Sequence, residues 1–339
     1  MVRRLPIYLL LDCSESMAGE PLEAVEVGVY TMLSALKKNP YAIETAHLSL
    51  ITFDAKARVV VPLTEVTAIN PPALSIRPGT SMGAALDLVQ ESINKEVVKT
   101  TADNKGDYKP MVFIMTDGQP TDDWHSPAAR LRSVRPHLAQ IYAIGCGEEV
   151  DFETLSQIAD VCIHIKSLSP ESMAKLFVWL SASVQSQSAS PDTALSLEKK
   201  IPLEKGMELI DSARPPKFSG QNQRLFFHVA CSKTKKHYLM RYRFEQSSSL
   251  YTPESAIKLP DDFFGDGAKK TPPTGTDLLS DILDCPYCGA QALGKCGFCD
   301  HLFCVDPASA RAKVVCPVCE TTLSMAEDSG PFSIAGSQG

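Results

Sequence analysis

The chain has 339 residues, a formal net charge of -7, 44% hydrophobic residues and 22% charged residues. This length predicts two or three domains with at least one sizeable core. The acidic balance argues against a general nucleic-acid binder, which would carry a basic face. No stretch approaches the roughly 20 apolar residues of a membrane-spanning helix, and the start of the chain shows no signal-peptide pattern. We therefore expect a cytoplasmic protein with no transmembrane segment and no nucleic-acid partner.

Up to about residue 187, short apolar runs alternate with stretches of helical period. The run LPIYLLLD at residues 5–12 is continuously apolar up to its last residue, as in a parallel strand that is covered on both faces. Two β-rich runs at residues 47–54 and 57–66 predict a hairpin at one sheet edge. The alternation predicts an α/β domain over residues 1–187, with a mainly parallel sheet and helices on both faces.

The alternation of strand and helix patterns ends at a Ser-rich linker. Residues 224–245 read as two strands around the polar turn SKTKK, an antiparallel hairpin. We therefore expect a linker and β-rich region at residues 188–277, followed by a small Cys/His module at residues 278–325. Residues 326–339 are expected to be a flexible tail.

Oxygen-bearing side chains stand where strands of the first domain are expected to end. Asp12 ends the first strand and is followed by Ser14 and Ser16, while Asp117 ends a later strand. Thr80 lies in a loop before a helix. Ligands of open α/β sheets sit at the carboxyl ends of the strands, so we expect these five side chains to converge. Oxygen ligands suit Mg²⁺ or Mn²⁺, and a cation with an open position would attract a carboxylate from another molecule.

The segments DCSES, GTSMGAAL and TDGQPTD resemble the three parts of the metal-ion-dependent adhesion site (MIDAS) of von Willebrand factor A domains. The family pattern is Asp-x-Ser-x-Ser, a loop threonine and a strand-end aspartate, and this chain fills it without departure. The resemblance covers about residues 1–187 and implies a Rossmann-like A domain with a MIDAS. The nearby Asp122 and Asp123 could rim the ion site, but we favour the interpretation that they are solvated loop charges.

The cysteines predict a second kind of metal site. Four of the eleven are scattered, whereas seven crowd into residues 285–319. In a cytosol that keeps thiols reduced, such a cluster indicates metal binding rather than disulfides. Its members form three Cys-x-x-Cys pairs and one His-x-x-Cys pair, a spacing that lets both residues of a pair bind one tetrahedral Zn²⁺. The candidate zinc ligands are Cys285, Cys288, Cys296, Cys299, His301, Cys304, Cys316 and Cys319, and the scattered cysteines are Cys13, Cys146, Cys162 and Cys231.

The spacing leaves the pairing of these ligands open. An interleaved arrangement joins the first pair to His301 and Cys304, and the second pair to the last. A single zinc ribbon would use only the first and last pairs, and thiolates also hold iron–sulfur clusters. We favour two Zn²⁺ ions. Eight ligands for two ions leave no open coordination position, so we expect structural sites in a zinc-ribbon-like module.

The order of an A domain, a β-rich middle and a Cys/His module is similar to that of the TerY family of bacterial tellurite-resistance proteins. The resemblance rests on the A-domain motif together with the series CPYCG, CGFC, HLFC and CPVC, and it spans nearly the full chain. It implies a cytoplasmic scaffold in the chemical stress response, linked to a protein kinase and a PP2C-type phosphatase.

Two function classes fit the predicted cation site. The first is a non-enzymatic interaction protein that grips partner carboxylates through the cation. The second is a metal-dependent hydrolase or phosphatase that uses the same ion. Hydrolases of phosphate esters usually assemble more carboxylates or two metals, and here only Asp12 and Asp117 are expected at the ion. We therefore favour the binding module, with no catalytic residue.

Overall fold

The computed structural model describes residues 3–117, 119–133, 138–147, 150–189, 202–217, 224–260, 274–306, 313–324 and 332–334. The chain divides into two compact units. The first comprises residues 1–76 and 80–218, and the second comprises residues 77–79 and 219–339. Each unit is described by itself below.

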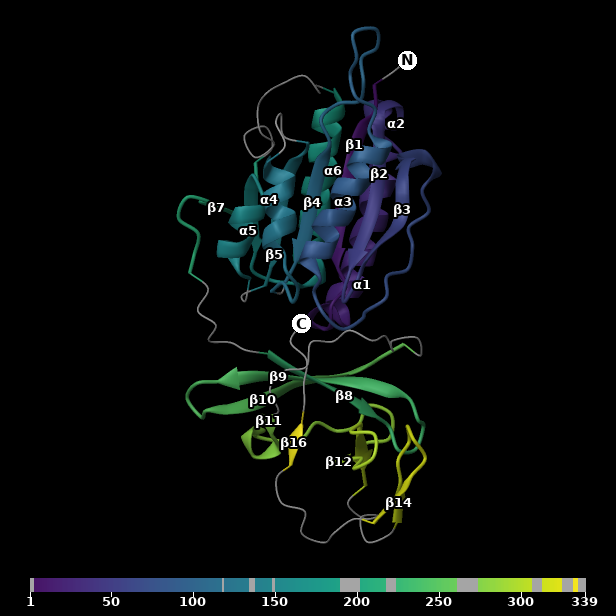
Figure 1. Ribbon diagram of the computed structural model, residues 1–339, viewed down its shortest axis with the longest axis vertical. Coiled ribbons are helices and arrows are strands. Elements are labelled where there is room, and N and C mark those ends of the chain that lie inside the picture. Colours follow the sequence, from purple (N-terminus) through teal and green to yellow (C-terminus); the bar gives the residue numbers. More distant parts are fainter. Residues whose placement is uncertain are drawn as a thin grey trace. The chain divides into compact units, whose positions relative to one another are not determined.

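The first unit is built on a seven-stranded sheet with the order β3-β2-β1-β4-β5-β6-β7 (Figure 1). The five inner strands are parallel, while β3 and β7 pair antiparallel at the two edges. This confirms the predicted mainly parallel sheet with an edge hairpin. The strands are β1 (Leu5–Asp12), β2 (Ala46–Phe53), β3 (Ala57–Glu65), β4 (Met111–Thr116), β5 (Gln140–Cys146), β6 (Val161–Ile165) and β7 (Met207–Ile210).

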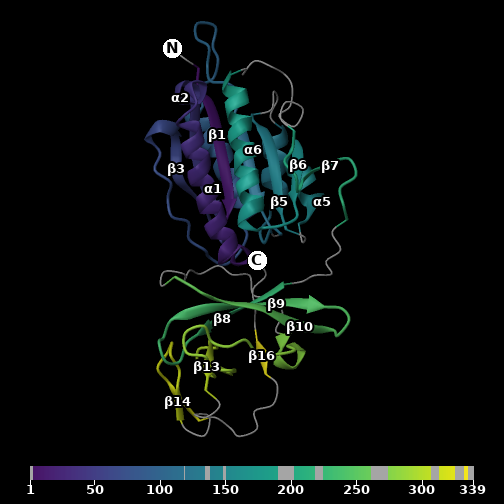
Figure 2. The same ribbon diagram turned by 180° about the vertical axis from the view of Figure 1, so that it is seen from behind.

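Helices cover both faces of this sheet, as the continuous apolar strands require. Helices α3, α4 and α5 pack on one face (Figure 1), where their apolar residues form a core with alternate residues of the inner strands. Helices α1 and α6 lie on the other face, with α2 beside them (Figure 2). The helices are α1 (Glu20–Leu36), α2 (Pro40–Thr45), α3 (Met82–Glu96), α4 (His125–Ser133), α5 (Phe152–Ile158) and α6 (Pro170–Ala189), with short 3₁₀ turns η1 (Glu15–Met17) and η2 (Val66–Ala68).

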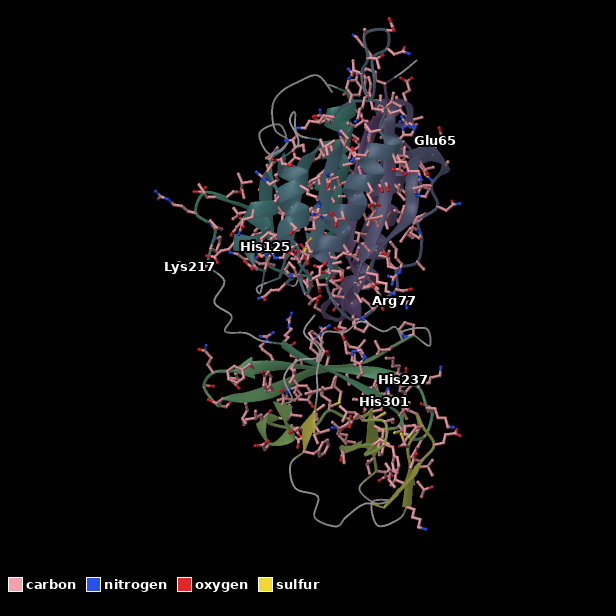
Figure 3. All side chains as sticks on the ribbon, in the orientation of Figure 1. Glu65, Arg77, His125, Lys217, His237 and His301 are labelled. Carbon is pink, nitrogen blue, oxygen red and sulfur yellow. The ribbon has the colours of Figure 1, made fainter. Side chains whose placement is uncertain are left out.

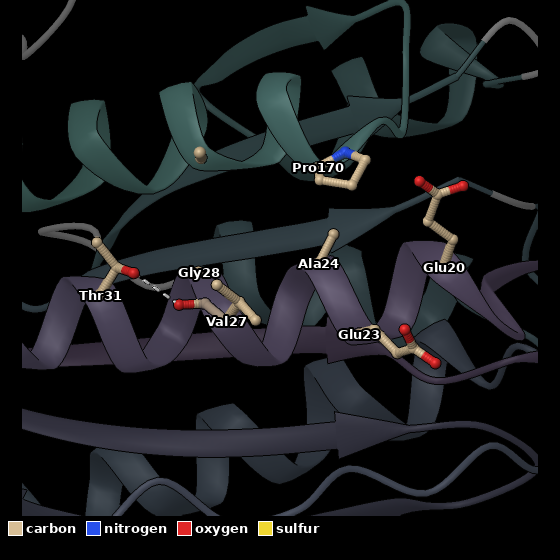
Figure 4. A pocket seen from close by; sticks show the side chains of 8 residues that line it. Glu20, Glu23, Ala24, Val27, Gly28, Thr31 and Pro170 are labelled. Carbon is tan, nitrogen blue, oxygen red and sulfur yellow. Dashed lines mark hydrogen bonds between the residues drawn. The ribbon is translucent and has the colours of Figure 1, made fainter.

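Helices α1 and α6 approach each other closely at Gly28. A Cβ atom added there would lie 2.0 Å from the ring of Phe177 on α6, so only glycine fits. Beside this contact the two helices leave a hollow of about 190 Å³ (Figure 4). It is lined by Glu20, Glu23, Ala24, Val27, Gly28 and Thr31 of α1 and by Pro170 and Ala174 of α6.

The second unit is built on a five-stranded sheet with the order β10-β9-β8-β13-β12. Strands β8, β9 and β10 form an antiparallel meander, and β13 pairs parallel to β8. Two small two-stranded ladders, β14–β15 and β11–β16, complete it. The elements are β8 (Arg224–Ala230), β9 (His237–Glu245), β10 (Leu250–Lys258), β11 (Thr274–Gly275), η3 (Thr276–Leu278), β12 (Ala292–Lys295), β13 (Leu302–Val305), β14 (Lys313–Val315), β15 (Thr322–Ser324) and β16 (Ser333–Ile334).

Three expected boundaries differ from this architecture. The first sheet extends past residue 187, because β7 adds to its edge. The β-rich region and the Cys/His module share one sheet, since β13 pairs with β8 across the expected boundary at residues 277/278. Within the expected tail, most of which lies outside the described residues, Ser333 and Ile334 pair with β11 and Ile334 is buried.

No helix within the described ranges is both long enough and apolar enough to cross a bilayer.

Candidate metal centres

The first centre lies at the carboxyl end of β1, in the middle of the first sheet. Asp12 is the last residue of β1 and is 1% exposed. Its Oδ1 accepts a 2.9 Å hydrogen bond from the backbone N of Ser14. Its Oδ2 accepts from Oγ1 of Thr116, the last residue of the adjacent strand β4. The carboxylate is thus held between two neighbouring parallel strands.

Ser14 and Ser16 extend this group across the sheet. Their hydroxyl oxygens are 2.9 Å apart, and Ser16 Oγ donates a 2.6 Å hydrogen bond to Oδ1 of Asp117, just after β4. Both serines are buried. The short turn η1 ends their segment, and Gly19, at φ 84°, takes the left-handed conformation that lets α1 begin at Glu20.

Thr80 lies in the loop before α3, and the loop that follows Asp117 holds it in place. The backbone N of Thr80 donates to Oγ1 of Thr121 at 3.0 Å, and Thr121 N donates back to the Thr80 carbonyl at 2.9 Å. The side-chain Oγ1 of Thr80 is buried and has no hydrogen-bond partner in the described part of the chain. A buried hydroxyl without a partner is costly, and a cation ligand role would satisfy it.

Asp122 has a role that the sequence reasoning missed. Its two carboxylate oxygens each accept a 2.9 Å hydrogen bond, one from the backbone N of Gly83 and one from that of Ala84. It therefore caps the first turn of α3 from another loop, instead of being a solvated charge. Gly83 is required there, because a Cβ atom would lie 2.2 Å from the carbonyl oxygen of Asp123. Asp123 itself is exposed, as expected, and binds Ser126 and His125.

The electrostatics of this oxygen group favour a cation. Burial, together with the nearby charge of Asp117, raises the pKa of Asp12 to about 7. The carboxylates of Asp12 and Asp117 and the hydroxyls of Ser14 and Ser16 form a connected set of hard-oxygen donors of the kind that Mg²⁺ and Mn²⁺ prefer. The residues present therefore fit a divalent cation.

A family model matches the part of the chain that carries these oxygens. Residues 7–171 match the model of the von Willebrand factor type A (VWA) domain. The first unit is a VWA domain. The MIDAS that the sequence resemblance predicts here consists of Asp12, Ser14, Ser16, Thr80 and Asp117, of which Asp12, Ser14, Ser16 and Asp117 are joined by hydrogen bonds.

Two curated relatives match a little under half of this chain. The uncharacterized protein sll0103 of Synechocystis sp. (strain ATCC 27184 / PCC 6803 / Kazusa) is 29% identical over 161 residues, which is 46% of this chain and 36% of that protein. Matrilin-3 of Gallus gallus is 26% identical over 163 residues, which is 46% of this chain and 34% of matrilin-3. The chain thus spans about a third of the length of these relatives.

Two solved structures are similar to about half of the chain. The von Willebrand factor type A protein from Catenulispora acidiphila superposes with a TM-score of 0.42 at 18% identity, over 54% of this chain and 43% of that one. Proximal thread matrix protein 1 from the mussel byssus, in a structure described as having a zinc occupied MIDAS motif, gives a TM-score of 0.40 at 19% identity, over 54% and 48% of the two chains.

The second unit brings eight cysteines together in two groups of four. In each group the sulfur atoms all lie within 4.8 Å of one another, and the cysteines are free of disulfides. Three of the sulfur pairs within these groups lie 3.5 to 3.7 Å apart. A disulfide would need about 2.05 Å, whereas sulfurs around a tetrahedral Zn²⁺ are about 3.8 Å apart for Zn–S bonds of about 2.3 Å. The first group is Cys231, Cys285, Cys288 and Cys304, and the second is Cys296, Cys299, Cys316 and Cys319.

The structure does not place His301 in either group. Its Nδ1 lies 2.9 Å from the carbonyl oxygen of Cys299, and the residue is exposed (Figure 3). The reason is local: the His301 carbonyl closes the turn that begins at Cys296, and the ring turns back over that turn. Cys231, which was counted among the scattered cysteines, takes the expected place of His301. The pairing is otherwise the interleaved one.

Proposed function

We propose that this chain is a cation-dependent protein-interaction scaffold that binds partner carboxylates through the MIDAS of its VWA domain. The observation that supports this most is the continuous buried group from Asp12 through Ser14 and Ser16 to Asp117. The buried Oγ1 of Thr80, which has no partner within the described residues, adds a further donor. The proposed cation is Mg²⁺ or Mn²⁺, bound by these five side chains.

The chemistry of the site favours capture of an acidic partner. The chain contributes two carboxylates, which balance the two charges of the cation, and neutral hydroxyls supply the remaining protein ligands. Mg²⁺ usually keeps several waters, and one of them is exchangeable for an oxygen of another molecule. A carboxylate of a partner is the strongest such oxygen ligand in proteins at neutral pH. The partner would therefore present an exposed Asp, Glu or chain terminus.

The same group supports binding better than hydrolysis. A phosphate-ester hydrolase needs a positioned nucleophile or base, often between two metals. The hydrogen bonds around Asp12 join its carboxylate and that of Asp117 to hydroxyls and to a backbone N–H, and both carboxylates are assigned to a single cation in this proposal. We therefore propose a non-enzymatic role.

The biological setting is proposed from the resemblance to the TerY family. It places the chain in the bacterial response to tellurite and related chemical stress, with a protein kinase and a PP2C-type phosphatase as partners. The eleven unpaired thiols suit the reducing cytoplasm. The two cysteine groups would hold structural Zn²⁺ ions, because four thiolates close a tetrahedral site and leave no position for substrate.

Partner capture from cell extract tests this function. The full chain is compared with Asp117→Ala and with the matched variant Asp123→Ala, which removes an exposed aspartate from the same loop. We expect the wild type and Asp123→Ala to retain partners in Mg²⁺, and Asp117→Ala to lose them. The cation is withdrawn by gel filtration rather than by EDTA, because EDTA would also strip zinc. If Asp117→Ala captures the same partners as the wild type, the MIDAS is not the binding site.

A further inference from the structure

The β8–β9 turn carries a single cysteine, Cys231, which lies 54 residues before the next cysteine in the chain (285 − 231 = 54). Its sulfur nevertheless lies within 4.8 Å of the sulfurs of Cys285, Cys288 and Cys304. Cys231, Cys285 and Cys304 belong to the same buried cluster of the second unit, and the partly buried Cys288 packs against it. A strand pairing brings them together, because β13, which carries Cys304, runs parallel to β8.

The backbone of this turn is closed by two hydrogen bonds. Cys231 N donates to the carbonyl of Lys236 at 2.7 Å, and Lys235 N donates to the carbonyl of Cys231 at 2.8 Å. Lys235 has φ 59°, a left-handed conformation that a lysine rarely adopts. Strand β9 resumes at residue 237, six residues after the cysteine.

The three Cys-x-x-Cys turns have the same backbone. In each turn, the backbone N of the first cysteine donates a hydrogen bond to the carbonyl of the residue five positions later. The backbone N of the residue four positions later donates a second bond to the carbonyl of that cysteine, and these bonds are 2.8 to 3.0 Å long. The residue four positions after the first cysteine has a positive φ in every case. After Cys296 and Cys316, the next strand also begins six residues on. The positive-φ residues are Gly289, Asp300 and Glu320.

The β8–β9 turn therefore has the backbone of a Cys-x-x-Cys turn but only one of its two cysteines. Thr234 stands three residues after Cys231, where the other turns have their second cysteine. The group that contains Cys231 consequently takes its fourth sulfur from a strand, at Cys304. Backbone donors serve both sulfurs: Thr234 N lies 3.4 Å from Cys231 Sγ, and Ser232 N lies 3.3 Å from Cys304 Sγ. Such N–H donors to sulfur stabilise a thiolate ligand.

We infer that Cys231 is a ligand of a closed four-cysteine Zn²⁺ site with Cys285, Cys288 and Cys304, and that this ion fastens the β8–β9 hairpin to the Cys-rich segment. The inference rests on the proposal that the cysteine groups bind zinc. It assigns an all-sulfur shell to both ions and excludes His301 from either. It also makes the β-rich region and the Cys-rich segment one metal-dependent folding unit, because the site joins residues on both sides of the expected boundary.

The coordination shell of the full-length protein tests this assignment. We expect about two Zn²⁺ per chain by elemental analysis, and an X-ray absorption spectrum that fits four sulfurs per zinc with no imidazole shell. If His301 replaced Cys231, the spectrum would average about 3.5 sulfurs and 0.5 nitrogens per zinc. That result would overturn the inference and leave zinc binding intact. An absence of zinc would instead overturn the proposed zinc sites, and neither result bears on capture through the MIDAS.

Two variants of the full chain sharpen the test. His301→Ala is expected to keep both zinc ions and the all-sulfur spectrum. Cys231→His is expected to keep both ions and to bring one nitrogen into the shell, which a merely structural cysteine would not do. Loss of one zinc from His301→Ala, or an all-sulfur shell in Cys231→His, would overturn the inference. If Cys231→His fails to fold, the wild-type spectrum and His301→Ala still decide the question.

Discussion

Ser16 Oγ donates a 2.6 Å hydrogen bond to Oδ1 of Asp117, although 101 residues separate the two in the chain. The bond joins the turn after β1 to the end of β4, the two neighbouring strands at the centre of the first sheet. It closes the group that begins at Asp12 and passes through Ser14. A serine hydroxyl that donates this bond still has lone pairs for a cation, so the bond can orient Ser16 as a ligand of the proposed ion.

Removing the charge of Asp12 is expected to stabilise the cation-free protein. Burial and the charge of Asp117 disfavour the ionised form of this carboxyl, whose pKa is raised to about 7. Asp12→Asn keeps the shape and removes the charge, so we expect the free energy of unfolding at pH 8 to rise by on the order of 2 kcal/mol without Mg²⁺. Thermal unfolding measures this, and a lower Tm for Asp12→Asn in cation-free buffer would contradict it.

The stabilising effect of Mg²⁺ is expected to increase with pH. Because the folded pKa of Asp12 is raised above its ordinary value of 3.8, its contribution to stability is full below about pH 4 and is lost as pH rises to about 7. Mg²⁺ binds the ionised site and cancels this loss. At free Mg²⁺ of 100 times Kd, binding adds about 2.7 kcal/mol. We expect a larger Mg²⁺-induced Tm shift at pH 8 than at pH 6, and almost none in Asp12→Asn. Equal shifts of the wild type at both pH values would argue against the raised pKa.

Asp122 is expected to act on cation affinity without being a ligand. Asp122→Ala leaves the N–H groups of Gly83 and Ala84 without their acceptor, at a cost of about 1 to 2 kcal/mol. The freed end of α3 adjoins the Thr80 loop, so Mg²⁺ affinity should fall severalfold, with a smaller fall in Asp122→Asn, which keeps one acceptor oxygen. Isothermal titration measures both, with Asp123→Ala as the control. Wild-type Mg²⁺ affinity in Asp122→Ala would show that the cap does not position the ligand.

Gly28→Ala is expected to destabilise the first unit. The added Cβ atom would lie 2.0 Å from the ring of Phe177, so α6 must move away from α1. Overpacking of this kind costs about 1 to 3 kcal/mol. Gly297→Ala is the matched control, because a Cβ atom there meets nothing within 4 Å. Equal Tm values for the two variants would mean that the α1–α6 contact yields more easily than its geometry indicates.

A cysteine at position 234 is expected to replace Cys304. In the three Cys-x-x-Cys turns, the sulfur three residues after the first cysteine belongs to the same group as the first. Cys304→Ser should lower the zinc content of the full chain from about two ions to about one. The double variant Cys304→Ser/Thr234→Cys should restore the second ion, as elemental analysis of dialysed protein would show. No recovery would mean that the β8–β9 turn is not equivalent to the other three.

The local pattern of apolar and polar residues determined most of the fold of the first unit. Continuous apolar strands and amphipathic helices follow from the periodicity of neighbouring residues, and parallel strands place all their carboxyl ends at one edge. The sequence therefore sufficed to expect the mainly parallel sheet and to bring Asp12, Ser14, Ser16 and Asp117 to that edge. The sequence did not predict that Asp122 caps α3. An aspartate in a loop has the same local sequence pattern whether it faces water or the end of a distant helix.

Tertiary structure alone decided which residues make up the first cysteine group. Sequence spacing identifies residues that share one turn, and it therefore predicts the Cys-x-x-Cys pairs correctly. The same spacing pairs His301 with Cys304, and it gives no reason to include Cys231. The pairing of β13 with β8 is what brings Cys304 next to Cys231, the single cysteine of its turn. Pairing between strands that are dozens of residues apart depends on how whole faces of the sheet pack, and local spacing does not reveal it. For the same reason the expected boundary at residues 277/278 falls within a single sheet.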